Sequence, residues 1–280
     1  MSLLYGRVAK VIVGPPGQIG KEVTDLRITF KIEKTSESNP NTATISVYNM
    51  AKDTRSLCEK KGNAVVLKCG YDTNIPLVFS GDIAKCTTEK QGPDIITTME
   101  AGDGQVAFDT STFDQSFAPG ATVQSIFQQV TGSFGVAVGP LLGIPNDSVN
   151  NGMTLSGDSK KHMDDLTKKY GMEWSIQDGQ IQVAPKNTPV FGTAVLLNSE
   201  TGLIGSPKRV KILKANSDPL LGDFNKDAGV TFRSLLNPKL KPGQLVSLQS
   251  VNVTGLYTCR KVVHSGDTHS MPWQSECDAI

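Results

Sequence analysis

The sequence predicts a mainly β protein of the α+β class, in which two small β-barrel-like units flank a small α/β unit. Short runs of alternating apolar and polar residues fill both ends of the chain, as expected of strands with one buried face. Helical spacing of apolar residues is clearest in the middle. From these changes of pattern we predict a first β domain over residues 1–104, a middle domain over 105–187 and a second β domain over 188–280.

The first β unit is the most regular stretch of the chain. Ile28, Phe30 and Ile32 alternate with polar residues, and a polar turn leads into a second alternating run. Residues 50–60 interrupt the strands with a predicted short helix. Further strand-like runs follow at roughly ten-residue spacing, which is typical of a small closed or nearly closed barrel.

The middle unit carries two predicted helices and a hairpin. Thr122 is a candidate cap for a helix that ends at Gly132, and Ser159 is a candidate cap for a second helix that ends at Gly171. The dipeptide Asp178-Gly179 between two strand-like runs predicts a tight β-hairpin. We expect a loop over residues 139–152, which are rich in Gly, Pro and Asn.

The second β unit begins after the boundary at Pro185 to Pro189. Strand-like runs cover residues 201–215, 230–237 and 244–267 and a short run at the C-terminus, with an ambiguous segment at 218–229. These predict a second barrel of similar size. No residue-level repeat relates it to the first.

Composition favours a globular protein. The 280 residues include 28 basic and 27 acidic side chains, so the chain lacks the basic surface of a dedicated nucleic-acid binder. No apolar run approaches the roughly 18 residues of a spanning helix. Arg7 and Lys10 interrupt the N-terminal apolar segment, which argues against a signal peptide. We expect the protein to stay in the cytosol and not to insert into a membrane.

Neither a metal site nor a cofactor is predicted. Cys259, His264, His269 and Cys277 lie within 19 positions and have zinc-competent side chains. However, Cys259 and His264 are an odd number of residues apart on a predicted strand, so they should face opposite sides. The five cysteines are interpreted as reduced packing residues.

No catalytic residues are predicted either. A nucleophile beside a base is absent from the sequence patterns, and Asp164-Asp165 are interpreted as solvated helix surface. Glu173 beside Trp174 is adequately explained by a strand edge. The glycines of Ala101 to Gly104 are interpreted as a turn that opens no helix.

Several motifs, taken in order, resemble one known family. They are the run Ile32 to Thr35 followed by Asn39 to Ile45, the runs Val66 to Tyr71 and Phe79 to Ile83, Ala101 to Gly104, Tyr170-Gly171 with Trp174, and His264 to Asp267 with Trp273. Together they resemble the central baseplate hub proteins of contractile-tailed bacteriophages, which are related to tail protein D and are found also in tail-derived particles.

The resemblance implies a structural virion protein that is made in the host cytoplasm and located in the tail baseplate. Each chain of such a homotrimer contributes two barrel-like domains to a ring, which adapts a threefold spike to a sixfold tail tube. The implied partners are the central spike protein, a tail tube or tube-initiator protein, other baseplate proteins and the tape-measure protein. DNA would only pass through the channel during genome ejection.

Two groups of residues are candidates for assembly. The first comprises turn or strand-edge positions and consists of Asn39, Pro40, Asn41, Thr42, Phe79, Gly81 and Asp82. The second is the densest basic patch, expected to line the lumen or to face a neighbouring subunit, although a solvated face explains it equally well: Lys208, Arg209, Lys211 and Lys214. Two alternatives stay open at this stage, a tail-associated cell-wall hydrolase and a monomeric carbohydrate- or protein-binding module.

Overall fold

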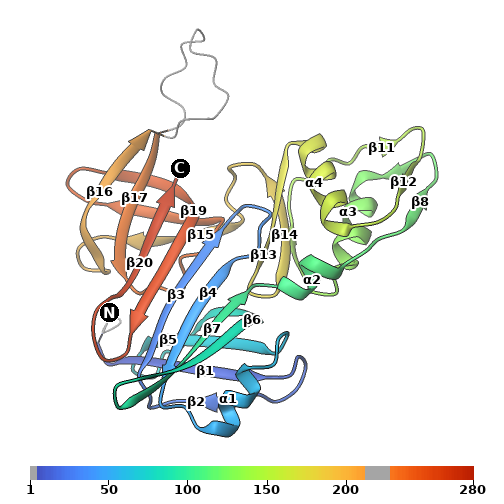
Figure 1. The fold of residues 1–280 in the computed structure, drawn as a ribbon. Helices are drawn as coiled ribbons and strands as arrows, with labels where there is room; N and C mark the ends of the chain where they lie inside the picture. The colour runs from blue at the N-terminus through green and yellow to red at the C-terminus, as the bar shows by residue number, and fades with distance from the viewer. Residues whose placement is uncertain (1–4, 212–227) are drawn as a thin grey trace.

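A computed structural model describes residues 5–211 and 228–280. Three parts of the chain are visible in Figure 1: the first β unit at the bottom, the second β unit at the upper left and the middle unit at the right. The predicted mainly β, α+β class is confirmed, since strands form most of the two β units and helices concentrate in the middle unit.

From residue 5 onward, the first β unit contains seven strands and one helix. Its alternating apolar residues point into a single core, as in Ile28–Thr35, where Ile28, Phe30 and Ile32 are buried. Its elements are β1 (Arg7–Gly14), β2 (Lys21–Val23), β3 (Ile28–Thr35), β4 (Thr42–Tyr48), α1 (Lys52–Cys58), β5 (Ala64–Tyr71), β6 (Leu77–Gln91) and β7 (Asp94–Gly102).

The middle unit packs three helices against small sheets. Its elements are α2 (Gln105–Thr110), β8 (Gln115–Phe117), β9 (Ala121–Thr122), α3 (Val123–Gly132), β10 (Ala137–Leu141), β11 (Ser148–Val149), β12 (Met153–Leu155), α4 (Ser159–Tyr170), β13 (Met172–Gln177) and β14 (Gln180–Pro185). The hairpin at Asp178-Gly179 and the end of α4 at Gly171, in left-handed conformation, are confirmed.

Three local predictions for the middle unit need correction. Helix α4 is capped by Asp158, whose carboxylate accepts from the Lys160 N–H, rather than by Ser159. Helix α2 begins directly after Gly104, where a turn without a helix was predicted. The predicted loop over 139–152 includes part of β10 and all of β11, because neighbouring strands provide the hydrogen bonds that a local pattern cannot reveal.

Six strands of the second β unit lie within its described residues. They are β15 (Phe191–Leu197), β16 (Leu203–Lys211), β17 (Ala228–Leu235), β18 (Gln244–Gln249), β19 (Thr254–Asp267) and β20 (Trp273–Ala279). The ambiguous segment at 218–229 lies mostly outside the described residues.

The two β units share one sheet of 13 strands, which runs in the order β16-β17-β20-β19-β3-β4-β7-β6-β5-β1-β2, with β18 and β15 branching from β19. The expected barrels are therefore open: among the described strands no pairing closes either unit on itself. Instead β3 pairs antiparallel with β19, with His264 opposite Ile32. This β3–β19 joint connects the two units through backbone hydrogen bonds (Figure 1).

Six strands of each unit follow the same order. In the first unit the sheet order is β3-β4-β7-β6-β5-β1, and in the second it is β16-β17-β20-β19-β18-β15. The six strands correspond in chain order, so β1 matches β15, β3 matches β16, and so on to β7 and β20. With this correspondence the two sheet orders are identical. The long strands β6 and β19 also shift register at matching places, between Ile83 and Lys85 and between Cys259 and Lys261. The second unit thus repeats the first in topology.

One pairing differs between the two units. Strand β1 is antiparallel to β5, whereas β15 is parallel to β18. The chain enters the second unit from the middle unit, so its first strand runs in the opposite sense relative to its partner. The repeat is therefore clearest over the five strands that follow.

Candidate assembly site

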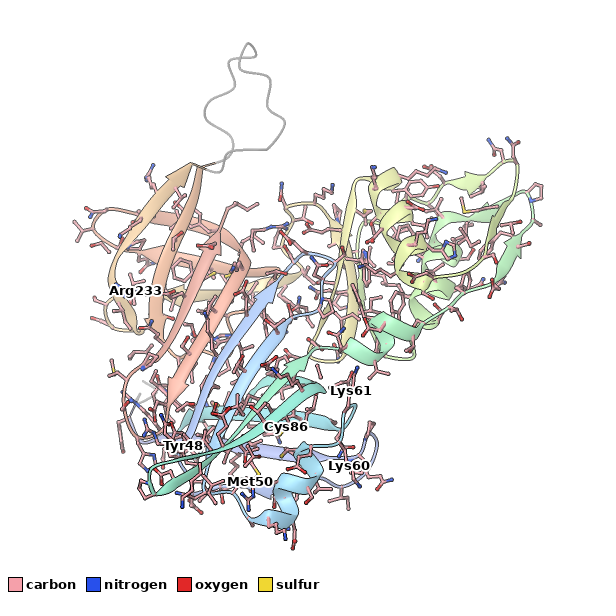
Figure 2. All side chains as sticks on the ribbon, viewed as in Figure 1. Tyr48, Met50, Lys60, Lys61, Cys86 and Arg233 are labelled. Carbon is pink, nitrogen blue, oxygen red and sulfur yellow. The ribbon has the colours of Figure 1, made fainter. Side chains whose placement is uncertain are left out.

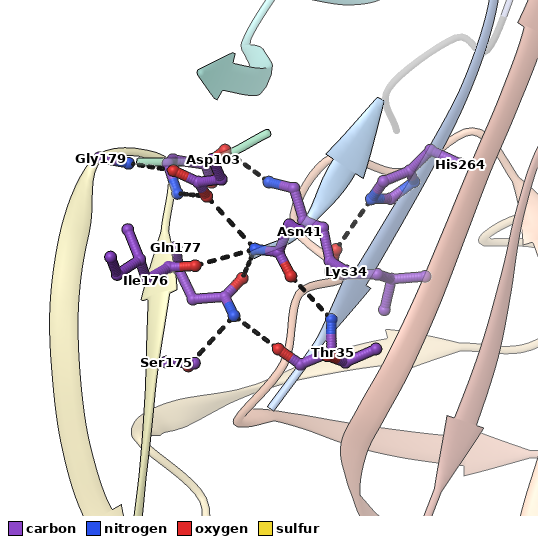
Figure 3. A network of polar contacts seen from close by, with 11 residues as sticks. Lys34, Thr35, Asn41, Asp103, Ser175, Ile176, Gln177, Gly179 and His264 are labelled. Carbon is purple, nitrogen blue, oxygen red and sulfur yellow. Dashed lines mark hydrogen bonds and ion pairs between the residues drawn. The ribbon is translucent and has the colours of Figure 1, made fainter. Parts of the chain in front are cut away.

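A buried polar cluster lies where the three units meet, and Asn41 is at its centre (Figure 3). Only 2% of Asn41 is exposed. Its side-chain oxygen accepts from the Thr35 N–H, while its Nδ2 donates to Ile176 O (2.9 Å), Gln177 Oε1 (2.9 Å) and Asp103 Oδ2 (3.2 Å). Because a buried amide is costly when unsatisfied, these contacts fix the middle unit on the first β unit.

The carboxylate of Asp103 binds the turn of the β13–β14 hairpin. Its oxygens accept from the backbone N–H groups of Asp178 and Gly179, which the left-handed turn points toward it. Burial, and then the negative charge of Asp178, raise the pKa of Asp103 to about 6, while these hydrogen bonds act in the opposite direction. The Asp178-Gly179 turn therefore closes the hairpin and also provides the N–H groups that attach the middle unit to Asp103 of the first β unit.

Lys34 brings a positive charge into the same cluster. Its side chain is 3% exposed and pairs with Asp178 across the boundary between units. Nearby, His264 on β19 is fully enclosed, with Nδ1 2.8 Å from Ser275 Oγ and Nε2 3.1 Å from Leu240 O. Burial first, and the charge of Lys34 second, lower the pKa of His264 to about 3, so the imidazole is neutral at pH 7.

Glu173 and Asp164, both interpreted from sequence as ordinary surface acids, have specific partners. Glu173 on β13 forms a two-pronged ion pair with Arg260 on β19, with Nη2 2.7 Å from Oε2. Asp164 accepts from the indole N–H of Trp174 at 2.8 Å. The first contact connects the middle unit to the second β unit and the second orders the middle unit itself.

The β3–β19 joint has an apolar side. Trp273 of β20 is 2% exposed and packs edge-on against Phe30 at 5.6 Å between ring centroids and against Tyr71 at 6.5 Å. It thereby joins the hydrophobic core of the first unit. Beside it, Arg27 pairs with Asp267 at 2.8 Å. Burial alone would raise the pKa of Asp267, but hydrogen bonds from Arg27, the His269 N–H and Ser270 lower it to about 2.

The candidate residues of the polar turn face different environments. Asn39 and Thr42 are exposed and Pro40 is half-buried, whereas Asn41 is buried within the chain in the cluster described above. Asn39 and Thr42 are thus placed to reach another molecule. A contact of Asn41 with a neighbouring subunit stays a prediction.

The candidate residues on β6 lie at its bent first half. Phe79 is fully buried in the core, and a Cβ on Gly81 would lie 2.5 Å from Gly102 O, so only glycine fits there. Asp82 is half-buried and accepts from the Val106 N–H at the start of α2. Substitutions at Phe79 or Gly81 will therefore act first through folding.

The basic patch lies on the outermost strand of the second unit. Lys208 and Arg209 are exposed on β16, where Arg209 stands opposite Val230 and Lys208 opposite Thr231 of β17. Neighbouring positions alternate between the faces of a strand, so these two side chains point to opposite sides. Lys211 continues the same ladder, and Lys214 lies outside the described residues.

The four zinc-competent residues near the C-terminus do not form a cluster. Over residues 5–211 and 228–280, no group of three His, Cys, Asp or Glu side chains could hold a metal ion. The prediction that Cys259 and His264 face opposite sides is nevertheless wrong: Cys259 Sγ lies 2.8 Å from Cys277 Sγ, and Cys277 shares its face of β20 with Ser275, the partner of His264. The register shift beside Arg260 adds one residue and resets the alternation.

A groove of about 770 Å³ lies where the middle unit meets the two β units, and Leu77, Asp178 and Phe191 are among its lining residues. Its charged lining residues are Asp178, which already pairs with Lys34, and Lys239 and Lys241. Lys241 stacks over the ring of Phe191 at 3.8 Å. This lining offers no nucleophile beside a base. Separately, none of the helices in the described part of the chain is both long and apolar enough to cross a membrane.

Sequence reasoning missed the contacts between the middle unit and the two β units. Arg260 and Glu173 are 87 residues apart, and Asn41 and Gln177 are 136 apart. The motif from Asn39 to Thr42 looked like an exposed turn because local pattern carries no signal for a distant docking hairpin. The only usable clue was the Asp-Gly dipeptide, whose turn exposes two N–H groups to an acid.

Comparison with solved structures finds the same fold in tail proteins. A tail protein from Neisseria meningitidis MC58 is 12% identical, with a TM-score of 0.69 over 98% of this chain and 96% of that one. The 43 kDa tail protein of prophage MuSo2 from Shewanella oneidensis is 10% identical, with a TM-score of 0.65 over 97% and 98%.

A third neighbour is an E. coli protein, c3393, a component of the type VI secretion system described as structurally similar to the T4 tail proteins gp27 and gp5. It is 11% identical, with a TM-score of 0.63 over 96% of this chain and 76% of that one. No curated protein matches the chain by sequence. Residues 9–263, however, match the family described as Baseplate hub gp41, and the chain therefore belongs to this family of phage baseplate hub proteins.

Proposed function

We propose that the protein forms the homotrimeric central hub of a phage tail baseplate. Membership of the baseplate hub family makes it a structural protein of the tail baseplate. The finer proposal is that three chains form a ring that adapts a threefold spike to a sixfold tail tube and encloses the channel. The single observation that carries it is the repeated strand order, which gives each chain two equivalent β units.

The division of the chain follows from the same repeat. We place a first β domain at 1–104, a middle domain at 105–187 and a second β domain at 188–280. Three separate hydrophobic clusters support this division, and among the described residues of the last segment only Leu236 and Trp273 pack into the first cluster. Three chains would then supply six similar β domains, which is the count a sixfold tube requires.

The proposed partners follow from this position in the tail. They are the central spike protein on one side of the ring, the tail tube or a tube-initiator protein on the other, further baseplate proteins and the tape-measure protein. DNA would pass through the channel without specific binding. Asn39 and Thr42 are exposed candidate assembly contacts, and the exposed basic residues Lys208 and Arg209 are candidates for the channel lumen or for a neighbouring subunit.

The test is the solution mass of the purified chain by light scattering over a concentration series. The proposal predicts a particle of three times the 29.9 kDa chain mass. A chain that stays monomeric at every concentration contradicts it and favours a monomeric binding module. Clearing of bacterial cell wall in a zymogram would favour a hydrolase instead, and the proposal predicts none.

A further inference from the structure

The inference concerns two strand edges that stay open in the single chain. Strand β16 pairs only with β17 among the described strands, so its other edge is free. On β6, residues 77–82 pair with β5 and residues 82–91 pair with β7. Opposite β7, the second half of β6 has no partner among the described strands. Free edges of this kind are ready to pair with another chain.

The β3–β19 joint supplies a template for what these edges can bind. In the topological repeat, β16 corresponds to β3 and β6 corresponds to β19. Within one chain, β3 of the first unit pairs with β19 of the second. The equivalent pairing, β16 with β6, does not occur within the chain. We therefore propose that β16 of one copy adds antiparallel to the second half of β6 of a second copy, which repeats the β3–β19 joint between subunits.

The register of this contact can be read from the ladders, beginning with β6. Lys261 of β19 and Lys85 of β6 are each the first paired residue after the register shift, so they correspond. Lys261 stands opposite Asp278, and Lys85 stands opposite Glu100. Ser265 and Glu89 each lie four residues after these lysines, so they also correspond. Further along, Ala279 of β20 corresponds to Ala101 of β7.

The position on β16 follows through the next strands. Val230 of β17 stands opposite Ala279, as Ala43 of β4 stands opposite Ala101. Arg209 stands opposite Val230, as Ile32 stands opposite Ala43. Lys208 therefore corresponds to Lys31.

Transferring the joint gives three predicted pairs. Lys31 stands opposite Ser265, Ile32 opposite His264 and Glu33 opposite Val263. Between copies, this places Lys208 opposite Glu89, Arg209 opposite Thr88 and Val210 opposite Thr87. An acid opposite a base favours this register, since cross-strand pairs of opposite charge stabilise a sheet. The ion pair Lys261–Glu33 serves the same purpose across the existing joint.

Exposure agrees with the proposed contact. Thr87, Thr88 and Glu89 are all exposed, as are Lys208 and Arg209, and 43% of the apolar residue Val210 is exposed on the free strand. Six strands lie between β16 and β6 in the sheet, and Figure 2 shows Arg233, on the strand next to β16, in the second β unit and Cys86 of β6 in the first. The two edges therefore cannot meet within one chain, and their pairing is a head-to-tail contact, which closes into a ring when the rotation permits.

The partner is thus a second copy of this chain, and this inference rests on the proposed trimeric function. The direct test is a disulfide between Glu89→Cys and Lys208→Cys, made in a Cys86→Ser background so that the half-exposed thiol on the same strand does not compete. Residues directly opposite on antiparallel strands have Cα atoms within disulfide reach. Oxidation with copper phenanthroline should give dimers and trimers on a denaturing gel.

The matched control moves one cysteine by two residues. Glu89→Cys with Val210→Cys places the thiols diagonally, and cross-linking should fall about tenfold because disulfide geometry tolerates little extra separation. Equal yields for both pairs would overturn the proposed register. The single cysteine variants should give no cross-linked trimer on the denaturing gel. The circular dichroism spectrum of every variant should match that of the Cys86→Ser parent.

A second measurement does not depend on cysteines. Glu89→Lys and Lys208→Glu should each raise the concentration at which the trimer dissociates, by about tenfold when three joints are affected together. The double reversal should restore it. A trimer by mass with neither selective cross-linking nor charge rescue overturns the edge pairing but leaves the hub proposal standing. A monomer in both experiments contradicts both.

Discussion

The two β units have the same strand order but differ in what covers their edges. In the first unit the outer strand β3 is covered by β19, and helix α1 packs beside β6. In the second unit the equivalent outer strand, β16, is open. The difference identifies the strand edges as the surfaces to test for assembly: one joint is made within the chain, and we propose that its counterpart forms between neighbouring subunits.

The units also differ in residue identity at equivalent positions. Ile32 is buried in the first unit, whereas its counterpart Arg209 is exposed in the second. Yet Val65 and Leu67 of β5 match Val246 and Leu248 of β18 in place, and all four are buried. The core positions keep their apolar character while the edge positions do not. This is why the repeat is invisible by residue comparison and clear in the ladders.

The largest expected effect comes from breaking the packing between units. Trp273→Ala removes the ring that enters the first core from the second unit. We expect a loss of about 3–5 kcal/mol in the free energy of unfolding, as for other large-to-small core substitutions. Urea denaturation measures it. Trp273→Phe is the control, since it keeps an aromatic ring beside Phe30, and a variant as stable as wild type would contradict the role of Trp273.

A smaller effect is expected from the buried polar cluster around Asn41. Asn41→Leu leaves the Thr35 N–H and the Gln177 side chain without their buried partner. Unsatisfied buried groups cost about 1–3 kcal/mol each, so the loss should be about 3 kcal/mol. Proteolysis between the units should accelerate at the same time. Thr42→Ala, at an exposed neighbour, should change neither quantity by comparison.

The pH dependence separates Asp103 from His264, two of the groups whose pKa values are shifted. Between pH 4 and 6 the folded chain holds a proton on Asp103 that the unfolded chain releases, so this group stabilises the fold more as pH falls. His264 acts oppositely: its pKa near 3 is below the ordinary value of 6.5, so protonation of the unfolded chain removes stability as pH falls.

Removing one of these two groups should therefore reveal the pH dependence of stability that the other group causes. Asp103→Asn should make stability fall faster on acidification than in wild type, by up to about 1.4 kcal/mol per pH unit between pH 6 and 4. His264→Gln should change the slope with the opposite sign. Chemical denaturation at a series of pH values provides the slopes. Identical slopes for the three proteins would contradict the assigned environments.

The smallest effect is expected at the ion pair between the middle unit and the second β unit. Glu173→Gln should cost about 1 kcal/mol, because the pair with Arg260 is partly exposed and its charges are only partly desolvated. The loss should shrink further in high salt, as for other accessible ion pairs. A loss that is independent of salt would indicate packing rather than charge.

Local chemistry predicted the elements of this protein well. The alternation at Ile28, Phe30 and Ile32, the cap at Thr122 and the Asp178-Gly179 turn each correspond to an element found in the structure. Each depends on residues that are neighbours in sequence. The same period of two failed at Arg260, because a register shift leaves no mark in the residue pattern.

The joint could not be predicted from the sequence. Pairing of β3 with β19 joins residues more than 220 positions apart, such as Glu33 and Lys261, and nothing local specifies it. Closed or nearly closed barrels were predicted because strand spacing indicates how many strands exist but not which edges meet. Asn41 was selected as a candidate for a turn contact, yet its burial depends on a hairpin from another unit.

The most direct test of the account is the structure of the assembled ring by electron cryomicroscopy. The account predicts six joints of one kind, three within chains and three between them, with Lys208 of one copy opposite Glu89 of the next. A ring whose subunits meet through other surfaces, with the second half of β6 unpaired, would contradict it.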